Sequence, residues 1–169
     1  MTFKKPLALL TFALGLGAIG AAHADSHEMP TSAQISSAEE TADLMTNTVV
    51  AALVQEIGET TPENAAQGSR SISLVFNDRN EDMRLVGTID PVRDNDYPMD
   101  AFEEQALASA MQGAPSEGVE RVQGKWMYRR SIPLSNFAPQ CAMCHASFAA
   151  LPSSAMVGAL MLRVPIEGE

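Results

Sequence analysis

Two cysteines and a histidine lie close together near the end of this 169-residue chain, in the sequence QCAMCHASFA. Cys141, Cys144 and His145 form the pattern C-x-x-C-H, which is typical of a c-type haem attachment site. Two thiols at this spacing can form thioether bonds to the two vinyl groups of one porphyrin, and the adjacent imidazole can bind the iron. On a helix that begins near Pro139, all three side chains would project from one side. The pattern therefore predicts one covalently bound haem c per chain, with His145 as the proximal axial ligand.

Three other interpretations of the two cysteines are a disulfide, a thioredoxin-like redox pair and a structural zinc site. Export would offer oxidising conditions in which Cys141 and Cys144 could form a disulfide. A thioredoxin-like motif should follow a strand in a βαβ unit, whereas a proline-containing loop precedes this one. Two thiols and one histidine are one ligand short of a structural zinc site. Because the chain has no other cysteine and a histidine follows at once, haem is favoured.

The first 24 residues have the pattern of a secretory signal peptide. Lys4 and Lys5 form a basic start, residues 6–21 are uncharged, and residues 22–24 (AHA) form an A-x-A cleavage site. An uncleaved membrane anchor is the alternative, and the small residues of the apolar segment argue against it. We therefore expect a periplasmic or secreted protein that touches a membrane only if this segment is retained.

The remaining 145 residues would carry nine basic and 21 acidic side chains, a formal charge of −12. This length suits one domain with a modest core and a partly buried cofactor. Nucleic acid and anionic membrane surfaces are unfavourable partners for such an acidic chain. The charge fits a plain solvated surface or a basic redox partner protein, and a homodimer is also possible.

Hydrophobic periodicity predicts an α+β fold with an antiparallel sheet, N-terminal helices and a haem-attachment helix near the C-terminus. Residues 25–35 lack periodicity and are expected to form a mobile tail before a single domain at 36–169. Capping boxes at Ser36 and Ser37 predict a first helix over residues 38–57. Two further helices are expected at 61–68 and at 100–112, and Asp100 with Glu103 is the expected cap of the latter.

Two hairpins and one last strand complete the expected domain. Residues 71–76 alternate and should pair with residues 84–89. A second hairpin is expected over residues 119–134, with its turn at Gln123-Gly124, and residues 156–166 form an apolar run of strand length.

The second hairpin combines an apolar face with several basic side chains. Trp126, Tyr128 and Ile132 share the face expected to point inward, which turns Met127 outward. The hairpin also contains four basic side chains: Arg121, Lys125, Arg129 and Arg130. They could be solvated, or one or two arginines could pair with the haem propionates.

Three segments resemble those of a bacterial family. Residues 86–103 (VGTIDPVRDNDYPMDAFE) are similar to the pattern V-x-x-S-x-x-x-R-N-P-x-N-x-P-x-x-x-E. The matching residues, at roughly the right spacing, are Arg93, Asn95, Pro98 and Glu103. Residues 125–134 (KWMYRRSIPL) resemble a Y-x-R-P-I strand, and residues 157–165 a closing G-x-x-x-x-x-x-P strand. The family consists of exported or membrane-tethered proteins with a single c-type haem on a PAS-like domain.

This resemblance spans about residues 36–166. It implies haem binding, with electron transfer or redox and gas sensing as uses, and no established enzymatic reaction. Some members place a cysteine, which can ligate the iron on the distal side, after a helix similar to residues 61–69. The matching position here is Ser69, and because a hydroxyl is a poor ligand for haem iron, this arrangement is not carried over.

The second axial ligand separates electron transfer from ligand sensing, because a free position can bind a small molecule. His23 would leave with the signal peptide and His27 lies in the expected tail, so histidine is nearly excluded. Met45, on the apolar stripe of the first helix, is the best methionine candidate, whereas Met127 should point outward and Met143 lies too close to His145. An open or water-ligated iron is the alternative.

The sequence thus predicts an exported monohaem c-type cytochrome for electron transfer. The alternative is a haem-based redox or gas sensor, or ligand-binding module, that acts through a partner. A peroxidase is disfavoured because no spare distal histidine is present.

Overall fold

The computed structural model describes residues 28–76, 82–87 and 96–167. The expected signal peptide at 1–24 lies outside these ranges, and so do Arg93 and Asn95 of the family pattern. Within the described ranges, no helix is long and apolar enough to cross a membrane.

The first helix, α1 (Ser32–Gly58), starts earlier than the sequence predicts. Thr31 caps it: the Thr31 hydroxyl accepts the backbone N–H of Gln34, and the Gln34 side chain accepts the backbone N–H of Thr31. This reciprocal pair satisfies two donors that the helix itself leaves open. The expected boxes at Ser36 and Ser37 are therefore wrong, and residues 32–35 belong to the helix and not to a tail.

The second helix, α2 (Ala65–Val75), occupies the segment expected to be a strand at residues 71–76. Gly68, Ile72 and Phe76 recur every four residues and turn toward the interior. Gly68 allows close packing on the chain before α2, because a Cβ there would lie 3.0 Å from the Thr60 hydroxyl. The predicted hairpin of 71–76 with 84–89 is therefore wrong, since Ile72 and Phe76 fit helical spacing as well as alternation.

The sheet has four antiparallel strands in the order β1-β4-β3-β2. These are β1 (Met83–Gly87), β2 (Ser116–Val122), β3 (Lys125–Ser135) and β4 (Met156–Pro165). The predicted turn between β2 and β3 is confirmed, with positive φ angles of 50° at Gln123 and 85° at Gly124. The last strand, β4, lies inside the sheet and is buried along nearly its whole length. The α+β class is confirmed, and the single antiparallel sheet fits a PAS-like sheet at a coarse level.

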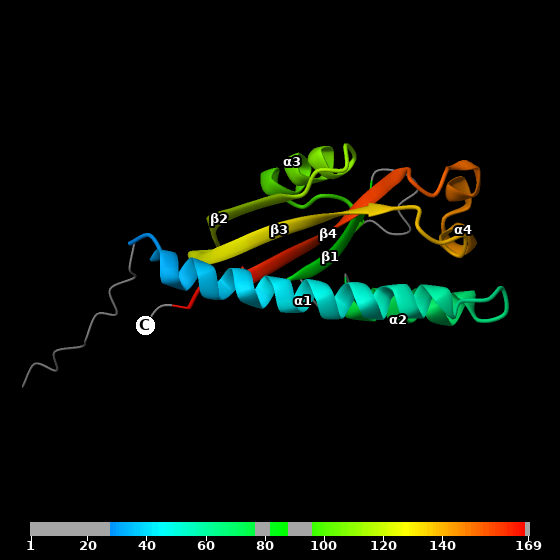
Figure 1. The fold of residues 1–169 in the computed structure, drawn as a ribbon, viewed down its shortest axis with the longest axis horizontal. Coiled ribbons are helices and arrows are strands. Elements are labelled where there is room, and N and C mark those ends of the chain that lie inside the picture. Colours follow the sequence, from blue (N-terminus) through cyan, green and yellow to red (C-terminus); the bar gives the residue numbers. More distant parts are fainter. Residues whose placement is uncertain (1–27, 77–81, 88–95, 168–169) are drawn as a thin grey trace, which may run out of the picture.

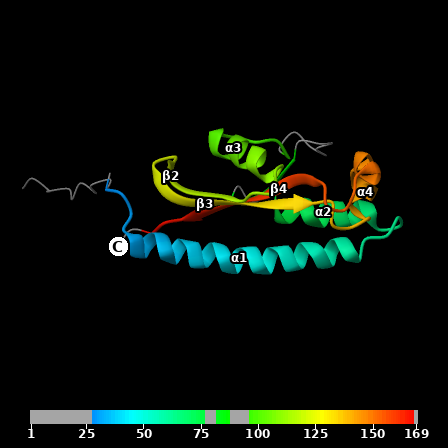
Figure 2. The ribbon, with the colours of Figure 1, turned by 45° about the horizontal axis from the view of Figure 1, so that its top comes forward.

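Helices cover both faces of the sheet (Figures 1 and 2). Helices α1 and α2 lie on one face, and α3 (Ala101–Ala110) lies on the other. Tyr128 is buried toward α1, as predicted. Met127 was expected to point outward but is buried, and so is Arg129, because their face of the strand is covered as well.

A cluster of charged side chains lies beneath α3, and we call it the α3 charge cluster: Arg84, Asp100, Glu103, Arg129 and Arg163. Glu103 is completely buried, and its carboxylate lies 3.3 Å from Arg84 Nε, 3.6 Å from Arg129 Nη2 and 3.4 Å from Arg163 Nη2. Asp100 caps α3 through the backbone N–H of Glu103, as predicted, and also pairs with Arg129 and Arg163. The cluster thus pairs its three arginines with two of the protein's own carboxylates.

Candidate functional site

The two cysteines lie on a single helical turn, α4 (Cys141–Cys144), which follows β3 at the end of the sheet next to α2 (Figures 1 and 2). The turn starts just after Pro139 and closes when the backbone N–H of His145 donates to the Cys141 carbonyl at 3.0 Å. His145 leaves helical geometry, with φ −117° and ψ 86°, and a 3-10 helix, η2 (Ala146–Ala150), follows. The expected helix is therefore present, but only as one turn.

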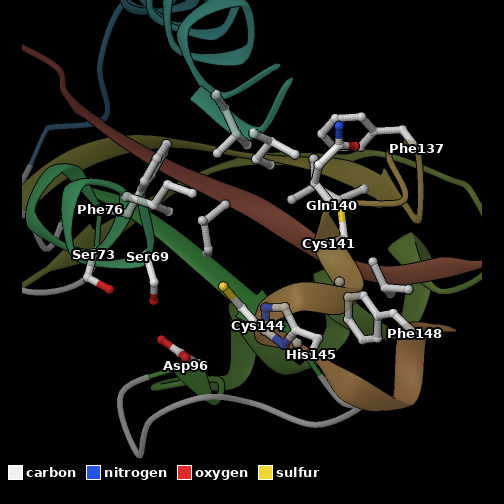
Figure 3. A pocket seen from close by; sticks show the side chains of 18 of the residues that line it. Ser69, Ser73, Phe76, Asp96, Phe137, Gln140, Cys141, Cys144, His145 and Phe148 are labelled. Carbon is white, nitrogen blue, oxygen red and sulfur yellow. The ribbon is translucent and has the colours of Figure 1, made fainter. Parts of the chain in front are cut away.

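Cys141, Cys144 and His145 line one pocket, whose cavity volume is about 180 Å³. Its walls come from the end of α1, from α2, from β1 and from the first residues of β4, so segments far apart in sequence meet there. Most of the wall is apolar, and it includes Leu53, Ile57, Ile72, Phe76, Leu85, Val86, Leu134, Phe137, Phe148 and Val157. Figure 3 shows the thiols and the imidazole among these side chains.

Packing holds the imidazole of His145 in place. Its ring stacks on the ring of buried Phe148, with centroids 4.5 Å apart and planes 11° from parallel. Buried Asn136 fixes the same segment, because its amide donates to the carbonyls of Phe148 and Leu151, at 3.1 Å each. The stack on Phe148 and the two hydrogen bonds from Asn136 together set the plane of the His145 ring.

Both cysteines are free thiols, so the structure contains no Cys141–Cys144 disulfide. Burial raises the pKa of the Cys141 thiol, with a smaller contribution from the nearby Cys144, whereas two backbone hydrogen bonds oppose the increase. Cys144 is exposed at the mouth of the pocket. In the described part of the chain, no three His, Cys, Asp or Glu side chains are grouped as a structural zinc ion would need.

Two glycines bring β1 and β4 unusually close at the pocket wall. Gly87 pairs with Gly158 in the sheet, and both line the pocket. A Cβ at Gly158 would lie 2.4 Å from the Val86 carbonyl oxygen, which no rotation of a side chain could relieve. A flat wall without side chains at these two positions leaves room for a ligand to approach the backbone.

The structure does not bring Met45 to the pocket. Met45 packs between the sheet and α1 among Leu162, Val164 and their neighbours, and it lies two to three helical turns before Leu53 and Ile57, the α1 residues at the pocket. The fold therefore gives no support to Met45 as a distal ligand.

The basic residues of the second hairpin also lie elsewhere. Arg129 belongs to the α3 charge cluster and also pairs with Glu120, and Arg130 pairs with Asp43. Arg121 donates to the Gly124 carbonyl at 2.8 Å, next to exposed Lys125, at the opposite end of β3 from the pocket. None of these four side chains lines the pocket, so the fold gives no support to their pairing with haem propionates.

Two serines of α2 and one aspartate form a polar side of the pocket. Ser69 and Ser73 are one helical turn apart and both line it, together with Asp96. In Figure 3 their hydroxyl groups point toward Asp96, and Cys144 and His145 lie across the same space. The sequence identified only Ser69; the i, i+4 spacing would have indicated Ser73 had the segment been recognised as a helix.

The sequence matches the Tll0287-like family over residues 23–159, which is most of the chain and includes Cys141, Cys144 and His145. The chain belongs to the Tll0287-like family. The domain that gives the family its name is cytochrome-related. No curated protein matches this Tll0287-like chain.

Proposed function

We propose that this Tll0287-like protein is an exported c-type haem protein that transfers electrons. Cys141 and Cys144 would hold one haem through thioether bonds, and His145 would be its axial ligand. One observation carries the proposal: two free thiols and one packed imidazole converge on a single, mainly apolar pocket. The same groups are one ligand short of a four-ligand zinc site.

The donor set fits the attachment of a haem. Cys141 and Cys144 would each add across one vinyl group, with the sulfur bonding to one vinyl carbon and the hydrogen going to the other, so no oxidant or reductant would be consumed. The addition needs free thiols, which both cysteines provide. Imidazole is a common haem-iron ligand, and the stack on Phe148 holds that of His145 in one plane.

The residues around the motif would adapt the site to electron transfer. A haem iron changes between Fe(III) and Fe(II), and burial among apolar groups and nearby charge tune its potential. Leu53, Ile57 and Phe76 would exclude water from one side of the group. The exposed position of Cys144 would leave an edge open for exchange with a partner, and the acidic chain favours a basic redox partner.

Expression of the full chain in cells that mature c-type cytochromes would test the proposal. The purified protein should give a pyridine haemochrome spectrum of thioether-bound haem, with one haem per chain. Cys141→Ala and Cys144→Ala should each shift that spectrum to the single-thioether form, and His145→Ala should change the axial ligation. Met143→Ala is the matched control, because Met143 is exposed within the motif and lies outside the pocket lining. A wild-type protein that never acquires covalent haem would refute the proposal.

A further inference from the structure

Apart from the two attachment cysteines, the described residues of the pocket offer no second side chain of the kind that normally binds haem iron. Protein ligands of haem iron are histidine, methionine, cysteine and tyrosine. Among the described residues that line the pocket, only Cys141, Cys144 and His145 belong to these types. The internal segments 77–81 (NDRNE) and 88–95 (TIDPVRDN), whose structure is not described, contain none of the four types.

The nearest tyrosine and methionine side chains do not line the pocket. Tyr97 and Met99 follow Asp96 in sequence but are 50% and 56% exposed. Met143 is 42% exposed and sits between the two cysteines. Met45 belongs to the core beneath α1.

What the wall across from His145 does offer is two hydroxyl groups. Ser69 and Ser73 are half-buried on the pocket face of α2, with apolar Ile72 and Phe76 beside them. A hydroxyl can donate one hydrogen bond and accept others, but it is a weak iron ligand. Low-dielectric surroundings strengthen such hydrogen bonds.

We propose that the iron position opposite His145 is left for a small neutral ligand, which the hydroxyl groups of Ser69 and Ser73 hold by hydrogen bonds. This inference rests on the haem attachment proposed above and not on electron transfer, for which an open iron position is not needed. The ligand is water or a diatomic molecule, and the two serines are positioning residues that set its affinity. Asp96, at the same wall of a strongly acidic chain, disfavours anions.

The test uses the full holoprotein after covalent haem has been verified. The ferric form should show a high-spin spectrum, and the ferrous form should bind carbon monoxide rapidly, with one molecule per haem. Ser69→Ala and Ser73→Ala should each weaken carbon monoxide binding about fivefold, as expected for one lost hydrogen bond. Each should also raise the infrared stretching frequency of bound carbon monoxide, a readout that a merely structural role would not move. Ser71→Ala is the matched control, because Ser71 lies on the same helix but not in the pocket lining.

The charge preference has a separate measurement. Azide is an anion at neutral pH, so Asp96→Asn should increase the azide affinity of the ferric protein severalfold, which is more than it changes the carbon monoxide affinity. An azide affinity that does not increase would refute the discrimination against anions.

The other outcomes are distinguishable. A chain without covalent haem would refute the proposed function. A chain with covalent haem that is low-spin and inert to carbon monoxide would leave that function intact and overturn the open position. Binding that neither serine substitution alters would overturn the role of Ser69 and Ser73. Substitution of Ser69 by methionine, as a gain of function, should convert the iron to a low-spin form that binds carbon monoxide slowly.

Discussion

Replacing Glu103 by glutamine should destabilise the protein strongly without touching the pocket. The Glu103 carboxylate is fully buried, lies within 3.3–3.6 Å of three guanidinium groups, and accepts the backbone N–H of Met99 at 2.9 Å. Glu103→Gln keeps nearly the same shape and removes one negative charge. Arg129 and Arg163 would then keep the partly exposed carboxylates of Asp100 and Glu120, whereas buried Arg84 would lose the carboxylate of Glu103.

The magnitude follows from the cost of breaking a buried ion pair. Removal of one partner typically costs about 3–5 kcal/mol, because the other charge stays buried without compensation. Two carboxylates remain in contact with the arginines, so we expect the lower end, about 3 kcal/mol. For a domain of this size each kcal/mol lowers Tm by about 3 °C, which predicts a decrease of about 9 °C.

Thermal unfolding followed by circular dichroism would measure this decrease, and Glu104→Gln is the control. Both glutamates lie in the first turn of α3, so both substitutions remove the same favourable interaction with the helix dipole. Glu104, however, is exposed, so its substitution should lower Tm by about 3 °C or less. Equal decreases for the two variants would refute the argument that the buried charges, and not the helix terminus, determine the loss.

Three further predictions concern the pocket wall, the loop after the motif and acid stability. Gly158→Ala should lower the free energy of unfolding by about 3 kcal/mol or more, because its Cβ would overlap the Val86 carbonyl. Gly58→Ala is the control and should not destabilise the protein, because a Cβ there would have no atom within 4 Å. Urea unfolding would compare the two variants. Asn136→Ala should lower the free energy of unfolding by about 2 kcal/mol, because the hydrogen bonds to Phe148 in η2 and to Leu151 just after it are lost, and it should broaden the absorbance bands of the haem protein. Burial raises the pKa of Asp100, but hydrogen bonds and charges from Arg129 and Arg163 outweigh it and lower the pKa overall. Ionised Asp100 therefore stabilises the fold fully at a pH above the unfolded-state pKa of about 3.9, and this stabilisation is lost as the pH falls through the lower folded-state pKa. Asp100→Asn should reduce the dependence of Tm on pH in that acid range.

Several elements of the fold could be predicted from local sequence signals. The hairpin turn at Gln123-Gly124 and the cap of α3 at Asp100 are confirmed, because each depends on a few neighbouring residues. The segment 71–76 was mistaken for a strand because it is short. Ile72 and Phe76 are four residues apart, a spacing that fits both the alternation of a strand and one face of a helix. The prediction that Met127 points outward was wrong for another reason. Alternation shows which residues share a face of the strand, but not whether a helix covers the other face of the sheet.

The sequence by itself determined the reactive groups of this protein. Cys141, Cys144 and His145 are recognisable without a structure because covalent attachment needs them within one helical turn of chain. Only the tertiary structure decided what faces them. The wall with Ser69, Ser73 and Asp96 forms because α2 packs beside α4 and because Gly87 and Gly158 let β1 and β4 approach each other. Met45 lies in the core because α1 is long enough to place it two to three turns away from the pocket. These placements depend on packing between distant segments, which no local spacing encodes.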